Sequence, residues 1–204
     1  MPGAAHMGSM LEELLDKFAT DDSDISLTLG TSMSRPDRVI QPVGAEATRR
    51  DEVGKETRAA YVRGHLNNIM VYDRERVLDY MDAESGDLEP LASAVYGLAE
   101  ESWSSHILTI ESVEAYGDEK GTGLALVLLG AAIEALSAGR KITVVLEPCP
   151  LDTKQLTASE LKAGQKKLRD HWAKLGFQRV SSRSKYMSLV ASDYEMPDSV
   201  LNAN

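Results

Sequence analysis

The chain contains very little cysteine and few aromatic residues. Its 204 residues include one Cys, two Trp and two Phe. The single cysteine, Cys149, excludes an intramolecular disulfide and a zinc site made of cysteines alone. No basic residue adjoins Cys149, which lies between Pro148 and Pro150, so the sequence gives no reason for a reactive thiolate. Scarce cysteine is typical of a reducing compartment, and we expect a cytoplasmic protein.

Metal-binding and membrane-spanning patterns are also lacking. His65 and His171 have no ligand partners at metal spacing, so no metal site is expected. The most apolar run, 121–138, is rich in Gly and Ala and is interrupted by Glu134, which favours a buried helix over a membrane span. Residues 1–10 have no signal-peptide pattern and are interpreted as an expression-vector remnant.

Basic residues are outnumbered, with 22 Lys and Arg against 32 Asp and Glu and a formal net charge of -10. This balance argues against nucleic acid as a partner. The charge is uneven: residues 73–120 hold 13 acids and 3 bases, whereas residues 151–187 hold 9 bases and 3 acids. The basic segment is either a solvated helix face or a rim that attracts an anionic cofactor.

The apolar pattern predicts one α/β (α+β) domain over residues 11–190, followed by a frayed polar tail over 191–204. Residues 107–113 and 142–146 read as central strands, because both faces of each are apolar. The apolar helix expected over 124–138 joins them, which implies a right-handed crossover and parallel neighbours. We therefore expect a mixed central sheet with helices on both faces.

The flanking segments are predicted from periodicity. A helix is expected over 11–18, and Asp73 is expected to cap a helix that carries Val77, Leu78 and Met81. A half-buried strand at 25–29 is expected to pair with a returning strand at 38–43. The polar stretch 44–58 reads as a mobile loop. The remaining expected elements are a β-type segment over 61–72, mainly at 66–72, a helix carrying Leu88, Leu91, Val95 and Leu98, a basic amphipathic helix from 159 and a hairpin over 177–190.

A glycine-rich turn, Asp118-Glu119-Lys120-Gly121-Thr122-Gly123-Leu124, lies between the first central strand and the long helix. Glycines let a ligand approach the backbone, and the free N–H groups of a first helical turn attract anions. The Thr122 hydroxyl can satisfy one of those donors. The local chemistry therefore predicts an anion site that holds a diphosphate.

Together with a second motif, His171-Trp172-Ala173-Lys174-Leu175-Gly176-Phe177, this turn resembles the GNAT superfamily of acetyl-coenzyme A-dependent N-acyltransferases. That family joins its fourth strand to a helix by Arg/Gln-x-x-Gly-x-Gly/Ala, and ends a later helix with an aromatic residue and Leu-Gly-Phe. The resemblance covers about 107–190. Asp118 stands where the family has Arg or Gln, and Trp172 stands where many members have a Tyr that acts as general acid.

The resemblance implies acetyl-coenzyme A as co-substrate. A backbone N–H near Ser112 or Val113 would polarise the thioester carbonyl, and Trp172 would line the channel for the pantetheine arm. The glycine-rich turn would bind the diphosphate through Asp118, Glu119, Lys120, Gly121, Thr122, Gly123 and Leu124. Two acidic side chains beside a diphosphate would repel it weakly, and Lys120 would offset part of that charge.

Direct acyl transfer needs a base and an acid. Glu111 is the first candidate base, because a carboxylate in an apolar strand has its pKa raised by desolvation; the alternative is an exposed Glu at a strand end. Glu114 is a second candidate. Tyr186 is either the acid or a packed aromatic residue. Trp103 and Trp172 are expected in the core, and His106 is expected to be structural.

Two hypotheses of different classes follow. The first is an N-acetyltransferase acting on a primary amine of a small molecule or peptide, with a cationic acceptor favoured by the acidic stretch. The second is a non-catalytic module that binds acyl-coenzyme A or a partner but has lost transfer. Neither nucleic acid nor membrane is expected as a partner, and a homodimer is left open.

Overall fold

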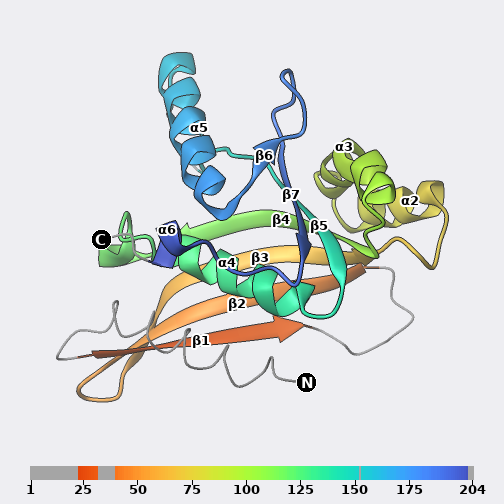
Figure 1. Cartoon of the computed structure of the whole chain (residues 1–204). Coiled ribbons are helices and arrows are strands. Elements are labelled where there is room, and N and C mark those ends of the chain that lie inside the picture. Colours follow the sequence, from red (N-terminus) through yellow and green to blue (C-terminus); the bar gives the residue numbers. More distant parts are fainter. Residues whose placement is uncertain (1–22, 32–39, 152, 202–204) are drawn as a thin grey trace.

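A computed structural model describes residues 23–31, 40–151 and 153–201. The helix expected over 11–18 lies outside these residues. Within the described ranges the chain forms a seven-stranded mixed sheet in the order β1-β2-β3-β4-β5-β7-β6 (Figure 1). The strands are β1 (Ser23–Thr31), β2 (Ile40–Asp51), β3 (Glu56–Asn68), β4 (His106–Ala115), β5 (Lys141–Leu146), β6 (Gln178–Arg179) and β7 (Met187–Ser192).

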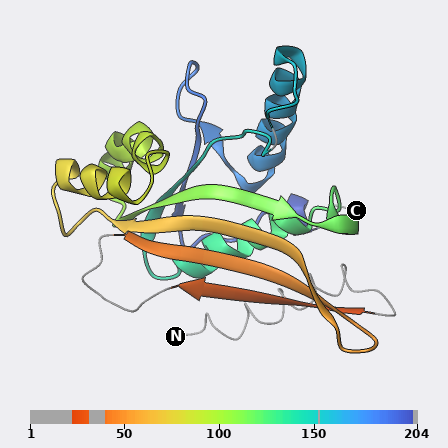
Figure 2. The same ribbon diagram turned by 180° about the vertical axis from the view of Figure 1, so that it is seen from behind.

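Helices cover both faces of this sheet, as expected. Leu108 and Val144 face the cluster that contains α4 (Leu124–Ser137), whereas Ile107 and Val145 face α2 (Arg74–Glu84) and α3 (Leu88–Glu101). Successive strand residues point to opposite faces, so this alternation places the two helical layers on opposite sides. Viewed from behind, β1 to β4 form a continuous twisted surface with α4 beyond it (Figure 2).

The two central strands are confirmed as parallel neighbours, from His106 opposite Ile142 to Ile110 opposite Leu146. Every other pair in the sheet is antiparallel. The chain continues through α5 (Ala158–Trp172), which begins at a capping box of Thr157 and Glu160, and ends its described part in α6 (Asp198–Leu201). Helix α5 and the β6–β7 hairpin project from the same edge of the sheet (Figure 1).

The loop predicted over 44–58 is wrong, because most of it is a β-hairpin. Strand β2 runs to Asp51, and β3 begins at Glu56. The core side chains here are alanines, among them Ala45, Ala47 and Ala60, which do not resemble the usual β-branched strand pattern. The charged residues of the hairpin pair across it, as Arg58 Nη2 does with Glu46 Oε2 at 3.0 Å.

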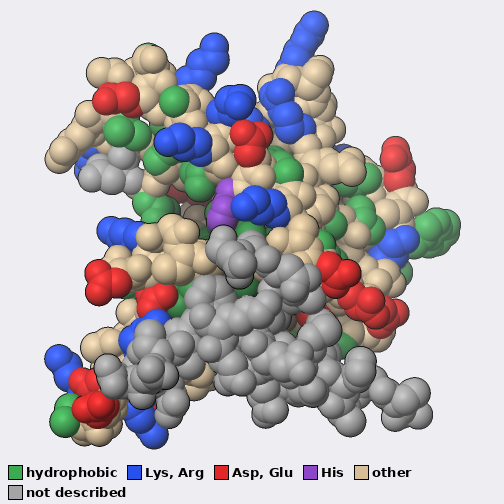
Figure 3. Space-filling model, turned by 60° about the vertical axis from the view of Figure 1, so that its left-hand side comes forward, with side chains coloured by type: hydrophobic (Ala, Val, Ile, Leu, Met, Phe, Trp, Pro, Cys, Tyr) green, Lys and Arg blue, Asp and Glu red, His purple; other side chains and the backbone are tan. Residues whose placement is uncertain are grey.

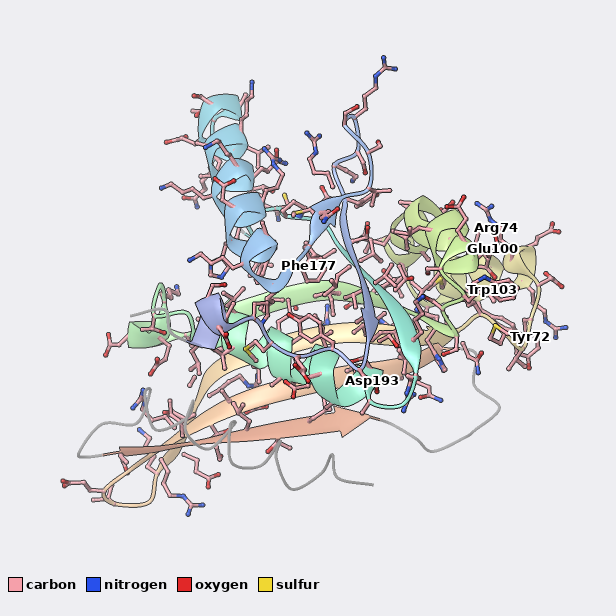
Figure 4. All side chains as sticks on the ribbon, viewed as in Figure 1. Tyr72, Arg74, Glu100, Trp103, Phe177 and Asp193 are labelled. Atoms are coloured by element: carbon pink, nitrogen blue, oxygen red, sulfur yellow. The ribbon has the colours of Figure 1, made fainter. Side chains whose placement is uncertain are left out.

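Two further expectations are wrong. Trp103 is 86% exposed rather than buried, and its backbone is left-handed with φ 57 at the end of α3. Figure 4 shows it at the α2–α3 end of the molecule, near Tyr72 and Glu100. The segment after residue 190, predicted to be frayed, is packed as far as Val200. Met196 and Val200 are buried in the core cluster that contains α4.

The C-terminal segment supplies a pH-dependent anchor. Tyr194 Oη donates a hydrogen bond to the Leu175 carbonyl oxygen at 2.9 Å, and burial, with a smaller contribution from the Glu134 charge, raises the pKa of Tyr194. A raised folded-state pKa means that the unfolded chain loses this proton first. Its stabilisation is therefore complete below about pH 10, the usual Tyr value, and is lost above it.

We expect Tyr194→Phe to flatten this alkaline loss. In the unmodified chain the free energy of unfolding should fall above pH 10 by up to about 1.4 kcal/mol per pH unit, the slope for one proton. Urea denaturation at pH 8 to 11 measures both slopes. An identical alkaline slope in the two proteins would contradict this assignment.

No helix in the described ranges is long and apolar enough to cross a membrane.

Candidate functional site

A cleft opens where the two central strands part. Their parallel pairing ends at Ile110 and Leu146, yet β4 continues to Ala115. Pro148 and Pro150 follow β5 and lack the N–H groups that would continue the ladder. The β5-facing edge of β4 beyond Ile110 therefore has no strand partner among the described residues.

The cleft has a volume of about 180 Å³. This is below the roughly 300–1,000 Å³ of ordinary small-molecule pockets, so it can hold only a slender part of a ligand. Four consecutive β4 residues, the chain after β5 and one side of α5 line it: Ile110, Glu111, Ser112, Val113, Leu146, Glu147, Cys149, Pro150, Leu151, Leu168 and Trp172. Trp172, expected to line a channel, and Ser112 and Val113, expected to offer a backbone N–H, are all among these residues.

Glu111 occupies a β-bulge. Arg63 pairs with Ser112 and the next β3 residue, Gly64, pairs with Ile110, so the backbone of Glu111 has no opposite residue in the β3–β4 register. A bulge re-aims a side chain and bends its strand, which contributes to the parting of β4 from β5. Gly64 is needed because an added Cβ would lie 2.3 Å from the Thr109 carbonyl oxygen.

The Glu111 carboxylate lies between two basic side chains of β3. Its Oε2 is 2.6 Å from Arg63 Nε, and its Oε1 is 2.9 Å from His65 Nδ1. The side chain is 17% exposed, so the alternative of a solvated strand-end Glu does not hold. In place of the apolar surroundings expected for it, the carboxylate has an arginine and a histidine beside it.

The glycine-rich turn follows β4 and leads into α4. Gly117, Gly121 and Gly123 all have positive φ, and nothing lies within 4 Å of a Cβ added to any of them. The N–H groups of Gly121, Gly123 and Ala125 make no hydrogen bond among the described residues. As predicted, the Thr122 hydroxyl accepts a hydrogen bond, from Leu124 N at 3.3 Å.

Of the two acids in this turn, only Asp118 remains exposed. Glu119 is 8% exposed and forms an ion pair with Arg49 of β2, whose Nε donates to Glu119 Oε1 at 2.9 Å. The expected repulsion between Glu119 and an anion is therefore offset by Arg49, and the negative charge of the turn is smaller than the sequence indicates.

Glu119→Ala should lower the free energy of unfolding by about 2 kcal/mol, because it removes the buried carboxylate that pairs with the Arg49 guanidinium. Asp118→Ala is the matched control; its side chain is exposed, and we expect a change within about 0.5 kcal/mol. Urea denaturation at pH 7 compares the two. Equal effects would show that the Arg49 contact does not stabilise the turn.

The proposed acid, Tyr186, does not line the cleft. It is half-buried and packs against the cluster of α2 and α3. Lys185 Nζ lies 4.9 Å from the Tyr186 ring and 2.8 Å from Glu147 Oε2, at the cleft. The hydrogen bond with Glu147 raises the pKa of Lys185. Tyr186 is therefore a packed aromatic residue, the second of the two roles considered for it.

Basic residues gather beside the cleft. Figure 3 shows Lys and Arg side chains over the upper half of one face, around a hollow in which a histidine side chain is visible. Helix α5 and the β6–β7 hairpin form the upper part of the molecule in Figure 1. The exposed bases of these elements and of the turn between them include Lys162, Lys166, Lys174, Arg179 and Arg183. The basic segment is therefore a solvated face next to the cleft, and its attraction for an anionic cofactor stays a prediction.

His106 and His171 have structural surroundings. Burial, with the Arg140 charge, lowers the pKa of His106, whose Nδ1 lies 2.8 Å from the Ser105 hydroxyl. Burial, with the Lys174 charge, lowers the pKa of His171, whose ring packs edge-on against Trp172. Among the residues the structure describes, no group of three or more His, Cys, Asp or Glu could hold a metal ion.

Neither the known protein families nor the curated proteins compared with this chain give a match. The site therefore has to be interpreted from its own geometry. Sequence reasoning missed Arg49, Arg63 and the role of His65. Their partners are 46 to 70 positions away in the chain, and no local pattern indicates such pairs.

Proposed function

We propose that the protein is a GNAT-type N-acetyltransferase that transfers an acetyl group from acetyl-coenzyme A to a primary amine. The observation that carries this proposal is the cleft between parallel β4 and β5, followed within a few residues by a turn with free N–H groups. A slender thioester arm suits the cleft, and a diphosphate suits the turn. Val113 and Gly117 are four residues apart, at most about 14 Å, so one extended ligand can reach both.

The chemistry assigned to the residues follows. A backbone N–H on the unpaired edge of β4, at Ser112 or Val113, polarises the thioester carbonyl. Glu111 takes a proton from the acceptor ammonium, and the neutral amine attacks. The C–N bond forms, the C–S bond breaks, and the leaving thiolate takes the second amine proton. Trp172 cannot supply that proton, and the packing of Tyr186 keeps it from the cleft.

A cationic acceptor is favoured by the charge of α2 and α3. Residues 73–101 contain nine acids and two bases, and these helices lie on the sheet face opposite α4. An amine approaching from this face would meet an attractive field. Spermidine, a lysine-containing peptide and an aminoglycoside such as kanamycin are suitable probes.

The test combines binding and turnover. Acetyl-coenzyme A should raise the melting temperature and slow alkylation of Cys149 by iodoacetamide, because Cys149 lines the cleft. Thiol release is then followed with each amine, and Cys149→Ser removes the background of the protein's own thiol. No protection and no release would contradict the proposal. Protection without release would favour the second candidate, a non-catalytic module that binds acyl-coenzyme A. Trp172, which stands where the resembling family usually has Tyr, supports this candidate.

A further inference from the structure

An exposed apolar patch lies at the α2–α3 end of the molecule. Met70 and Val71, in the loop after β3, are 71% and 61% exposed, and Trp103, in the loop before β4, is 86% exposed. The two loops lie side by side, because Ile69 N donates a hydrogen bond to the Ser105 carbonyl oxygen at 3.2 Å. Single exposed apolar residues are ordinary, whereas a cluster of large ones is typical of a binding surface.

The loop that carries Trp103 is fixed on both sides of it. Ser102 Oγ lies 2.9 Å from Ser104 Oγ, which in turn lies 2.8 Å from Oγ1 of the buried Thr143 of β5. Trp103 N donates a hydrogen bond to the Glu100 carbonyl oxygen at 3.0 Å. A left-handed backbone with φ 57 is unfavourable for so bulky a residue. The loop therefore holds its largest side chain in solvent at a cost, which suits the presentation of that side chain to a partner.

Acidic side chains surround this patch. Residues 73–101 contain nine acids and two bases, and the exposed Glu100 lies near Trp103 in Figure 4. The two bases stack on tyrosine rings, Arg74 at 5.2 Å and Arg76 at 4.9 Å from the ring centres. The patch thus combines apolar contact area with a negative field, and this combination is complementary to a basic and apolar partner.

We propose that the patch formed by Met70, Val71 and Trp103 binds a segment of another protein that carries Lys or Arg around a large apolar side chain. Trp103 is the apolar anchor, since Trp is enriched among the residues that dominate binding energy at interfaces. The acids of α2 and α3 attract the basic side chains of the partner. A second copy of this chain on the same patch would bring two acidic helix pairs together, and an anionic membrane surface would be repelled.

The patch is separate from the cleft, so the inference goes beyond the proposed acetyl transfer. Trp103 precedes His106, the first residue of β4, whereas the cleft begins at Ile110. Four residues of strand between His106 and Ile110 span about 13 Å. Binding at the patch therefore requires neither acetyl-coenzyme A nor turnover, and an absence of acetyl transfer would leave it unaffected.

The test uses a fluorescently labelled amphipathic peptide made of Leu and Lys, and a counterpart with Glu in place of Lys. Fluorescence anisotropy measures the Kd of each peptide, and we expect only the Lys peptide to bind. Trp103→Ser should weaken this binding by about tenfold or more, and Met70→Ser, on the neighbouring loop, by about threefold. Val53→Ser is the matched control. It removes an apolar side chain that is 87% exposed in the β2–β3 turn, and the Kd should not change.

Two results of the peptide measurement would overturn the proposal: no binding of the Lys peptide, or an equal Kd for Trp103→Ser and the unmodified chain. Sedimentation of the protein alone tests the second copy, because a dimer that Trp103→Ser converts to a monomer would make the patch a self-association surface. Flotation with phosphatidylglycerol vesicles tests a lipid surface in the same way. Either of these Trp103-dependent results would also overturn the proposal.

Discussion

Gly123→Asp is expected to abolish the stabilisation of the protein by acetyl-coenzyme A. At a ligand concentration of 100 Kd that stabilisation is about 2.7 kcal/mol, which corresponds to roughly 5–10 °C for a chain of this size. Gly123 directly precedes α4 with φ 95, beside free N–H groups. An aspartate there adds a negative charge where the diphosphate would lie, and its carboxylate competes for the same donors.

The fold should survive this change. A Cβ at Gly123 meets open space, so the expected loss is the left-handed strain of about 1–2 kcal/mol. Gly54→Asp is the matched control. Gly54 has φ 80, also faces open space, and lies in the β2–β3 turn. Both variants should melt at similarly reduced temperatures without ligand, and only Gly54→Asp should respond to acetyl-coenzyme A. A normal response in Gly123→Asp would place the diphosphate elsewhere.

Gly64→Ala is expected to lower the free energy of unfolding by about 3 kcal/mol. The added methyl group would lie 2.3 Å from the Thr109 carbonyl oxygen and 3.3 Å from Ile110 Cα. These are backbone atoms of β4, so relief requires the strands to move apart at the bulge that carries Glu111. Activity should fall together with stability.

Gly97→Ala provides the opposite expectation. Gly97 lies within α3, and nothing is within 4 Å of its added Cβ, so alanine should stabilise the protein by about 0.5–1 kcal/mol. Urea denaturation at pH 7 measures both changes. A Gly64→Ala protein as stable as the unmodified chain would show that the bulge tolerates a side chain and does not fix the position of Glu111.

The sequence predicted the centre of the fold better than its edge. The first half of β4, most of α4 and β5 are apolar on more than one side, and such runs indicate burial whatever their neighbours are. The β2–β3 hairpin was missed because small alanines fill its core face and because its charges pair only across strands. Those pairs appear once the register is known, and that register shifts between Ala47 and Thr48.

The candidate site was predicted unevenly for a similar reason. The glycine-rich turn is local, so its positive φ values and its Thr122 contact follow from residue type and order. The surroundings of Glu111 are not local: they depend on a bulge and on two side chains of another strand. The opening itself depends on where the strands end. Strand β5 ends at Leu146, opposite Ile110, while β4 continues to Ala115.

The contrasting exposure of the two tryptophans gives the molecule a built-in optical probe. Trp172 is 6% exposed and lines the cleft, whereas Trp103 is 86% exposed at the α2–α3 end (Figure 4). A water-soluble quencher such as iodide reaches Trp103 first, so the fluorescence that survives it comes from Trp172. Occupancy of the cleft by a thioester can then be followed by light in the unmodified chain, without a label and without turnover.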